Sequence, residues 1–269
     1  MERTQIMVKH SRHHRRSSVQ PKRVMLLWLL CLFAAGVLVV LLAASPAMSM
    51  LMAEGGTTGL SIKNGLVGEG LDVPYIDQRD KYPTGCESVT AVMALQYEGV
   101  DITVEEFIDS YLPQGDAPYE NEAGQLVGDS PWEVFLGSPY EDSGWGCYAS
   151  VIAGAVEELL QDRGSDLEVQ ELSGVSLDKL CAEYIDRGVP VMLWATIDME
   201  EPTLSTQYTL QNTGEPFTWI YPLHCLLLTG ETEDSYLFND PLAGKQVAYP
   251  KDQVERAYKG VGMQAVVVE

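Results

Sequence analysis

The sequence predicts an α+β domain that is preceded by one transmembrane helix. A run of 21 apolar residues lies near the N-terminus, helical periodicity dominates the chain as far as residue 188, and strand-like apolar runs follow. Helices first and a mostly antiparallel sheet afterwards is the α+β arrangement. A chain of 269 residues is also long enough for one domain with a sizeable core.

The N-terminal segment has the features of a membrane anchor. Residues 1–23 hold seven basic residues and one acid, a net charge of +6, and the apolar run Val24–Ala44 follows them. As a helix this run spans roughly 31 Å, the thickness of the hydrocarbon core of a bilayer. Because a basic flank stays in the cytoplasm, residues 1–23 are predicted to be a cytoplasmic tail, and the chain after Ala44 is predicted to be extracytoplasmic.

The alternative for this segment is a cleaved signal peptide, because Ser45 and Ala47 are small residues at a suitable spacing for cleavage. The apolar run is longer than the roughly 7–15 residues of a usual signal sequence, which favours an uncleaved, single-pass anchor in the cell membrane. Residues 45–70 are rich in Gly, Ser and Thr, which is typical of a linker. The folded domain is then expected over residues 71–269.

This domain is strongly acidic. The whole chain carries −22, which leaves −28 on residues 24–269. An acidic surface repels phosphate groups, so nucleic acid is excluded as an expected partner. The four cysteines after the apolar run have no regular spacing and give little support for a disulfide scaffold. We expect a monomer whose contact with the membrane is made by the N-terminal helix.

Helical spacing and end signals place the helices of the first half. Thr103 and Glu106 form a capping box at the start of one helix, and Gly99 is a stop signal at the end of another. Apolar residues recur at helical spacing in the two later segments. The predicted helices cover residues 87–98, 103–111, 149–164 and 176–188.

Apolar runs separated by turn signals indicate strands in the second half. A short helix is expected near residues 253–259. The predicted strands cover residues 189–197, 217–230, 235–240, 245–250 and 264–268.

A single histidine restricts the chemistry of the domain. Three of the four histidines lie in the N-terminal tail, and only His224 follows the membrane segment. Zinc hydrolases use two or three histidines, so neither a metal nor another cofactor is expected. If the strands around it form a hairpin centred on Thr232, His224 lies opposite Asp240 on one face. A carboxylate there fixes the tautomer of the ring, although Asp240 by itself is typical of a turn before Pro241.

The nucleophile is expected to be a cysteine, because the sequence has no GxSxG elbow for a serine. Cys181 and Cys225 lie in patterns typical of packed core positions. Cys86 in "PTGCES" and Cys147 in "GWGCYAS" both lie where a loop meets a helix, and a helix N-terminus lowers the pKa of a thiol. Only Cys86 has an amide donor for an oxyanion upstream, at Gln78.

The order Gln78, Cys86, His224, Asp240 is the order of parts in a papain-like thiol hydrolase. The blocks "VPYIDQRDKYPTGCESVTAVMALQYEGV", "GWGCYASVI", "LHCLLLTG" and "YLFNDPLAG" resemble the family-39-like cysteine peptidases, relatives of the proteases that trim double-glycine leaders from bacteriocins. The resemblance covers about residues 73–268. It implies a papain-like fold in which Cys86 is the nucleophile, His224 the base, Asp240 the residue that orients the ring, and Gln78 part of the oxyanion hole.

Two features depart from the bacteriocin-processing enzymes. The sequence has no ATPase motif, and the spacing of eight residues between Gln78 and Cys86 is longer than in the transporter-fused relatives. A leader peptide is therefore not assumed as the substrate. The sequence predicts a membrane-anchored, extracytoplasmic cysteine peptidase that acts on peptides or proteins. An amidase or acyltransferase with the same triad, and an inactive module that binds a peptide or a cell-wall component, are the alternatives.

Overall fold

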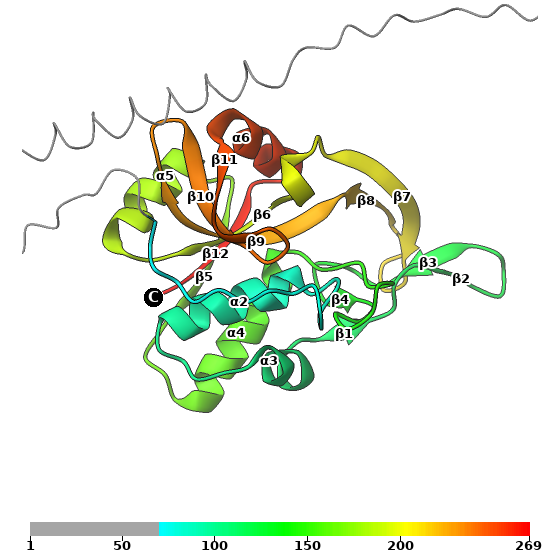
Figure 1. Ribbon diagram of the computed structural model, residues 1–269. Helices are drawn as coiled ribbons and strands as arrows, with labels where there is room; N and C mark the ends of the chain where they lie inside the picture. The colour runs from blue at the N-terminus through cyan, green and yellow to red at the C-terminus, as the bar shows by residue number, and fades with distance from the viewer. Residues whose placement is uncertain (1–69) are drawn as a thin grey trace, which may run out of the picture. The chain divides into compact units, whose positions relative to one another are not determined.

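The computed structural model describes residues 70–269 (Figure 1). The predicted cytoplasmic tail, the predicted transmembrane segment 24–44 and nearly all of the predicted linker lie outside the described residues. Within residues 70–269, no helix has both the length and the apolar composition that crossing a membrane requires.

A six-stranded antiparallel sheet forms the framework of the domain, and its spatial order is β11–β10–β9–β6–β12–β5. Five of the strands come from the second half of the domain, so the predicted α+β class is confirmed. The bounds are β5 (Val169–Ser173), β6 (Val191–Thr196), β9 (Leu223–Glu231), β10 (Ser235–Asp240), β11 (Gly244–Pro250) and β12 (Gln264–Val268).

Helices cover both faces of this sheet, as Figure 1 shows. One face packs against α2 (Cys86–Tyr97) and α4 (Ala149–Arg163), with α3 (Val104–Ser110) beside α2, and the other packs against α5 (Leu177–Glu183) and α6 (Lys251–Gly260). Successive residues of a strand point to opposite faces. Cys225 and Leu227 of β9 therefore enter the core on the α2 side, whereas Leu226 and Leu228 enter the core on the α6 side.

The predicted helices are confirmed to within two residues at each end, with one exception. The Thr103 side chain caps α3 by accepting a hydrogen bond from the Glu106 N–H at 3.1 Å. The exception is the segment 176–188. There α5 ends at Glu183, and a 3₁₀ turn follows before Gly188, which has a φ of +90°.

The prediction of one strand over residues 217–230 is wrong. Pro222 divides this run into β8 (Pro216–Tyr221) and β9, which belong to different sheets, because proline has no N–H to continue a ladder. A four-stranded sheet holds β8, and the order within it is β2–β3–β7–β8. The strands missed by the sequence patterns are β1 (Gln114–Gly115), β2 (Tyr119–Glu120), β3 (Leu126–Gly128), β4 (Phe135–Leu136), β5 and β7 (Thr203–Leu210).

The hairpin of β9 and β10 exists, but its predicted register is wrong. Asn239 pairs with Leu227 after an irregularity in the ladder, so His224 lies two residues away from a position opposite Asp240 and pairs with Ala195 of β6 instead. An error of an even number of residues leaves side chains on the same face. His224 and Asp240 therefore still meet, as described next.

Candidate active site

The site lies where the first residues of α2 meet the first residues of β9. Strand β10 leaves the ladder before it reaches this part of β9, so the backbone there is open on one side. The Cys225 N–H donates to Sγ of Cys86 at 3.4 Å, and the Cys225 carbonyl accepts from Oγ1 of Thr90 at 3.1 Å. Cys86 and Thr90 are four residues apart on one helix face. Two contacts therefore hold α2 against Cys225 and bring the sulfur beside the preceding residue, His224.

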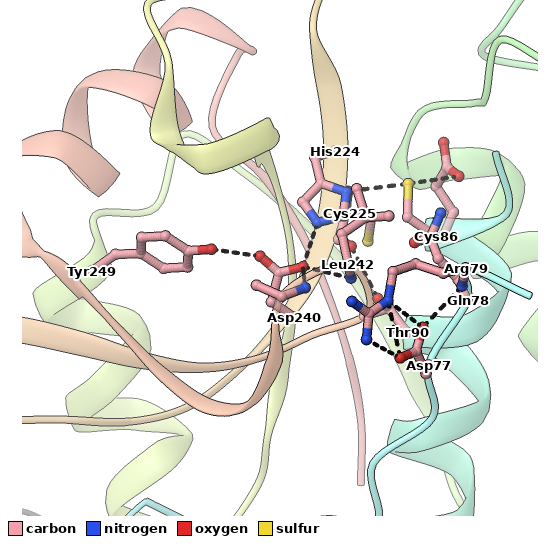
Figure 2. A network of polar contacts seen from close by, with 12 residues as sticks. Asp77, Gln78, Arg79, Cys86, Thr90, His224, Cys225, Asp240, Leu242 and Tyr249 are labelled. Carbon is pink, nitrogen blue, oxygen red and sulfur yellow. Dashed lines mark hydrogen bonds and ion pairs between the residues drawn. The ribbon is translucent and has the colours of Figure 1, made fainter. Parts of the chain in front are cut away.

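The His224 ring is anchored by Asp240, and both side chains are buried. Nε2 of His224 lies 2.8 Å from Oδ1 of Asp240, and because an ionised carboxylate only accepts, Nε2 carries the hydrogen. Nδ1 is buried without a hydrogen-bond partner among residues 70–269. Figure 2 shows the Cys86 sulfur on the side of the ring that faces away from Asp240. In a neutral His224 the unprotonated nitrogen is therefore Nδ1, on the side of the ring away from Asp240.

Further hydrogen bonds keep Asp240 ionised. Its Oδ1 accepts from the Leu242 N–H at 2.9 Å, and its Oδ2 accepts from the Tyr249 hydroxyl at 2.7 Å (Figure 2). Burial by itself raises the pKa of this carboxyl, but the contact with His224 and the bonds from Tyr249 and Leu242 outweigh it and lower the pKa to about 2. Asp240 is therefore an anion at neutral pH.

The cysteines differ from the prediction in their acidity. Burial raises the pKa of the Cys86 thiol, and the charge of Glu87 raises it further. Burial also raises the pKa of the Cys147 thiol. The prediction that the helix N-terminus lowers the pKa of both thiols is wrong, because the loss of solvation on burial raises both pKa values. Ionisation of Cys86 therefore requires a proton acceptor inside the site, and His224 lies in the wall of the same cleft.

Cys147 is fully buried and, unlike Cys86, does not line the cleft of the site. The contribution of Cys147 comes from its backbone, which forms two hydrogen bonds with buried side chains. The Cys147 N–H donates to Oε1 of Glu87 at 2.9 Å, and its carbonyl accepts from Nε1 of Trp194 at 2.9 Å. All four cysteines of residues 70–269 are free thiols.

Gln78 lies in the wall of the cleft, and its side chain is already engaged. Its Nε2 donates to the carbonyls of Tyr82 at 3.2 Å and Pro83 at 3.0 Å, and its backbone N–H donates to the carbonyl of Pro241 at 3.1 Å. Gln78 therefore joins the loop before Cys86 to the turn after Asp240. Both amide hydrogens are thus engaged, and neither is free for an oxyanion.

Glu87 is a residue of the site that the sequence patterns missed. Its side chain is 1% exposed, and Oε2 lies 3.2 Å from Sγ of Cys86. Burial raises the pKa of this carboxyl more than the hydrogen bonds around it lower the value. An acid in the first turn of a helix is typical of a solvent-exposed partner of the helix dipole. Nothing in the local sequence separates Glu87 from that ordinary role.

A cleft of about 430 Å³ opens onto Cys86 and His224. Strands β7 and β8 each supply two residues to its wall. The aromatic and aliphatic side chains of the wall are Pro83, Trp145, Ile197, Trp219, Tyr221, Pro222, Leu223 and Leu242, and the polar ones include Asp142, Ser205 and Thr206. A mostly apolar cleft with a few polar groups is the usual form of a binding site for an organic substrate.

A thiol and an imidazole in the wall of one cleft, with a buried carboxylate bound to the imidazole, define a cysteine peptidase-like site on an α+β scaffold. The chain belongs to the Peptidase_C39 like family, whose model matches residues 70–266, so the predicted resemblance to family-39-like peptidases is confirmed. It is similar to the uncharacterized protein YvpB of Bacillus subtilis (strain 168), with 26% identity over 201 residues that cover 74% of this chain and 75% of YvpB. It is also similar to a crystal structure described as a C39-like peptidase from Bacillus anthracis, with a TM-score of 0.63, 25% identity, and coverage of 75% of this chain and 98% of that one.

Proposed function

We propose that this protein cleaves peptide bonds through an acyl-enzyme formed on Cys86. The observation that carries the proposal is the orientation of the His224 ring. Its Nε2 is bound to Asp240 at 2.8 Å, while Nδ1 has no partner within residues 70–269 and lies on the side of the sulfur. The cleft of about 430 Å³ gives a substrate access to both groups.

The first step is proton transfer from Sγ of Cys86 to Nδ1 of His224. Asp240, an anion with a pKa of about 2, stabilises the imidazolium that results. The Cys225 N–H, 3.4 Å from Sγ, stabilises the thiolate. Because the pKa of the thiol is raised, the thiolate forms as an ion pair with His224 rather than by loss of a proton to solvent.

The thiolate then attacks the carbonyl carbon, and the carbonyl electrons move onto the oxygen. Cys86 is the first residue of α2, so its own backbone N–H has no acceptor within the helix and can donate to this oxyanion. We assign the second donor to Gln78. Its longer bond, 3.2 Å to the carbonyl of Tyr82, is the one exchanged for the substrate oxygen.

Collapse of the tetrahedral intermediate breaks the carbon–nitrogen bond, and the imidazolium gives its proton to the leaving amine. A water molecule, deprotonated by His224, then attacks the thioester, releases the acid product and restores the thiol. These steps use only the side chains and backbone N–H groups named above and a water molecule. The substrate is a peptide or protein.

The location belongs to the same proposal. The apolar run Val24–Ala44 and its basic flank support an anchored protein whose peptidase domain is extracytoplasmic. Fractionation of cells that produce the full chain, followed by digestion of intact cells with an added protease, tests this location.

Product analysis tests the reaction. Full-length protein in detergent is incubated with a mixture of unfolded polypeptides and amine acceptors, and the products are identified by mass spectrometry. We expect hydrolysed peptides with the wild type and none with Cys86→Ala. Amine-coupled products in place of hydrolysed ones would indicate an acyltransferase. Tight peptide binding without any product would indicate a binding module, and either result contradicts the proposal.

A further inference from the structure

We propose that Glu87 works as a neutral acid that donates a hydrogen bond to the Cys86 thiolate. This inference deepens the proposed function and rests on Cys86 being its nucleophile. It concerns how a buried sulfur can be ionised at all in a site where burial opposes every charge.

The fold builds a specific place for the Glu87 carboxyl group. Oε1 accepts a hydrogen bond from the Cys147 N–H at 2.9 Å, and Oε2 lies 3.2 Å from Sγ of Cys86. The Trp194 indole holds the Cys147 peptide from its carbonyl side at 2.9 Å. Gly146 has a φ of +113°, and a Cβ at this position would lie 2.5 Å from Oε1. Only glycine therefore allows the chain to pass so close to the carboxyl group.

The contacts of Glu87 do not compensate a negative charge on its carboxyl group in addition to the charge of the Cys86 thiolate. The groups that face it are the Cys86 thiol, the Cys147 N–H and, across the sulfur, His224, with Cys225 behind Cys86. No lysine or arginine of residues 70–269 forms an ion pair with it. Two anions 3.2 Å apart in a buried site strongly disfavour each other. When the sulfur is ionised, Glu87 therefore keeps its proton.

The geometry assigns the two oxygens of the neutral acid. Oε1, which accepts from the Cys147 N–H, is the carbonyl oxygen, and Oε2 carries the proton and donates to Sγ. When the thiol proton moves to Nδ1 of His224, Glu87 retains its own proton. The thiolate is then held by two donors, the Glu87 hydroxyl at 3.2 Å and the Cys225 N–H at 3.4 Å.

This arrangement predicts an unusual dependence on pH. In its neutral form Glu87 donates to the thiolate, whereas in its ionised form it opposes the thiolate. Burial raises the pKa of Glu87, so the neutral form persists to a higher pH than for an exposed glutamate. The reactivity of Cys86 should accordingly decline as Glu87 loses its proton, although thiol reactivity ordinarily rises with pH.

The test measures the rate at which iodoacetamide alkylates Cys86 in the full-length protein, from acid to alkaline pH, with the modified residue located by mass spectrometry. Glu87→Gln keeps a donor and the volume but has no proton to lose. We expect it to react within about threefold of the wild type at the wild-type optimum and to lack the alkaline decline. Glu87→Met keeps the volume without a donor, and we expect a rate about 10- to 100-fold lower. Glu158→Gln, an exposed site on α4, is the matched control.

Two results would overturn the inference. A Gln variant as slow as the Met variant would mean that Glu87 acts as an ionised acceptor. Unchanged rates and an unchanged pH profile in both variants would mean that Glu87 only fills space. If the Met variant fails to fold, the Gln variant alone decides, because persistence of its alkaline decline contradicts the inference. Alkylation needs no turnover, so a protein that follows this pattern but cleaves no peptide contradicts the proposed function and leaves the role of Glu87 standing.

Discussion

Cys86 and Cys147 lie in segments that look alike in the sequence and do different things in the structure. Each follows a glycine at a loop-to-helix junction, and each thiol is buried. Cys86 lines the cleft together with His224, and the neighbouring backbone N–H of Cys225 donates to its sulfur. Cys147 is absent from the cleft lining, and its backbone N–H and carbonyl are bound by Glu87 and Trp194, respectively. The Cys86 segment supplies a side chain to the site, whereas the Cys147 segment supplies a backbone N–H that binds Glu87.

The local signal for a reactive cysteine is therefore not sufficient to identify the nucleophile. A helix N-terminus favours an anion in both segments, yet burial raises the pKa of both thiols. What distinguishes Cys86 is a set of contacts with β9, more than 130 residues later in the chain. The two segments also cooperate, because Gly146 and Cys147 form the pocket that holds Glu87 beside Cys86.

Exchanging the two cysteines for alanine gives the largest expected contrast. Cys86→Ala should abolish hydrolysis, because the nucleophile is removed. Cys147→Ala should keep most of the activity, because the N–H that binds Glu87 belongs to the backbone and survives the substitution. It should cost about 1 kcal/mol of stability from the lost packing of a buried sulfur. The measurements are kcat/KM on a cleaved peptide and urea unfolding of each variant.

Urea unfolding of Cys86→Ala serves as the control for this pair, since a folded but inactive protein separates chemistry from stability. Undiminished hydrolysis by Cys86→Ala, combined with loss of activity in Cys147→Ala, would reverse the assignment of the two segments.

Asp240→Asn should have the next largest effect. The amide oxygen of asparagine can still accept from Nε2 of His224, but the negative charge that stabilises the imidazolium is lost. A hydrogen bond to a charged group is worth about 1.5–3 kcal/mol, so we expect kcat/KM to fall about 10- to 100-fold with some activity retained. Asp234→Asn, an exposed position on the same hairpin, is the control. An unchanged rate in Asp240→Asn would mean that Asp240 only stabilises the turn before Pro241 and has no role in catalysis.

The same variant should change the dependence of stability on pH. The pKa of Asp240 is lowered from 3.8 to about 2 in the folded state. Its contribution to stability is therefore fully present above about pH 4 and is lost as the pH falls toward 2. Urea unfolding at several pH values should show this loss in the wild type and a smaller one in Asp240→Asn.

The main helices of the fold can be predicted from local sequence patterns. The Thr103 cap marks the start of α3, Gly99 and Gly164 mark the ends of α2 and α4, and the apolar residues of α4 recur at helical spacing. The strands β1–β4 are only two or three residues long, and β7 shows no alternation, so they depend on neighbours that the sequence does not identify. The register of the β9–β10 hairpin depends on an irregularity between Leu237 and Phe238 that no turn signal indicates.

The candidate site is predictable to the extent that its residue types are scarce. His224 is the only histidine after the apolar run 24–44, and this scarcity points to it without any structure. Tyr249 and Glu87 belong to abundant types, and only their burial and contacts single them out. For Gln78 the sequence predicts the position near Cys86 but not the hydrogen bonds. Its amide donates to the carbonyls of Tyr82 and Pro83.

Gly146→Ala gives the smallest and most specific test of how the two segments cooperate. The new Cβ would lie 2.5 Å from Oε1 of Glu87 and force the carboxyl group away from Cys86. We expect alkylation of Cys86 to slow about tenfold, together with a stability loss of at least about 1 kcal/mol from the positive φ. Gly124→Ala is the matched control, because Gly124 also has a positive φ, +73°, but no atom lies within 4 Å of its added Cβ. If both variants lose stability and neither changes the reactivity of Cys86, the Cys147 segment contributes only structure to the site.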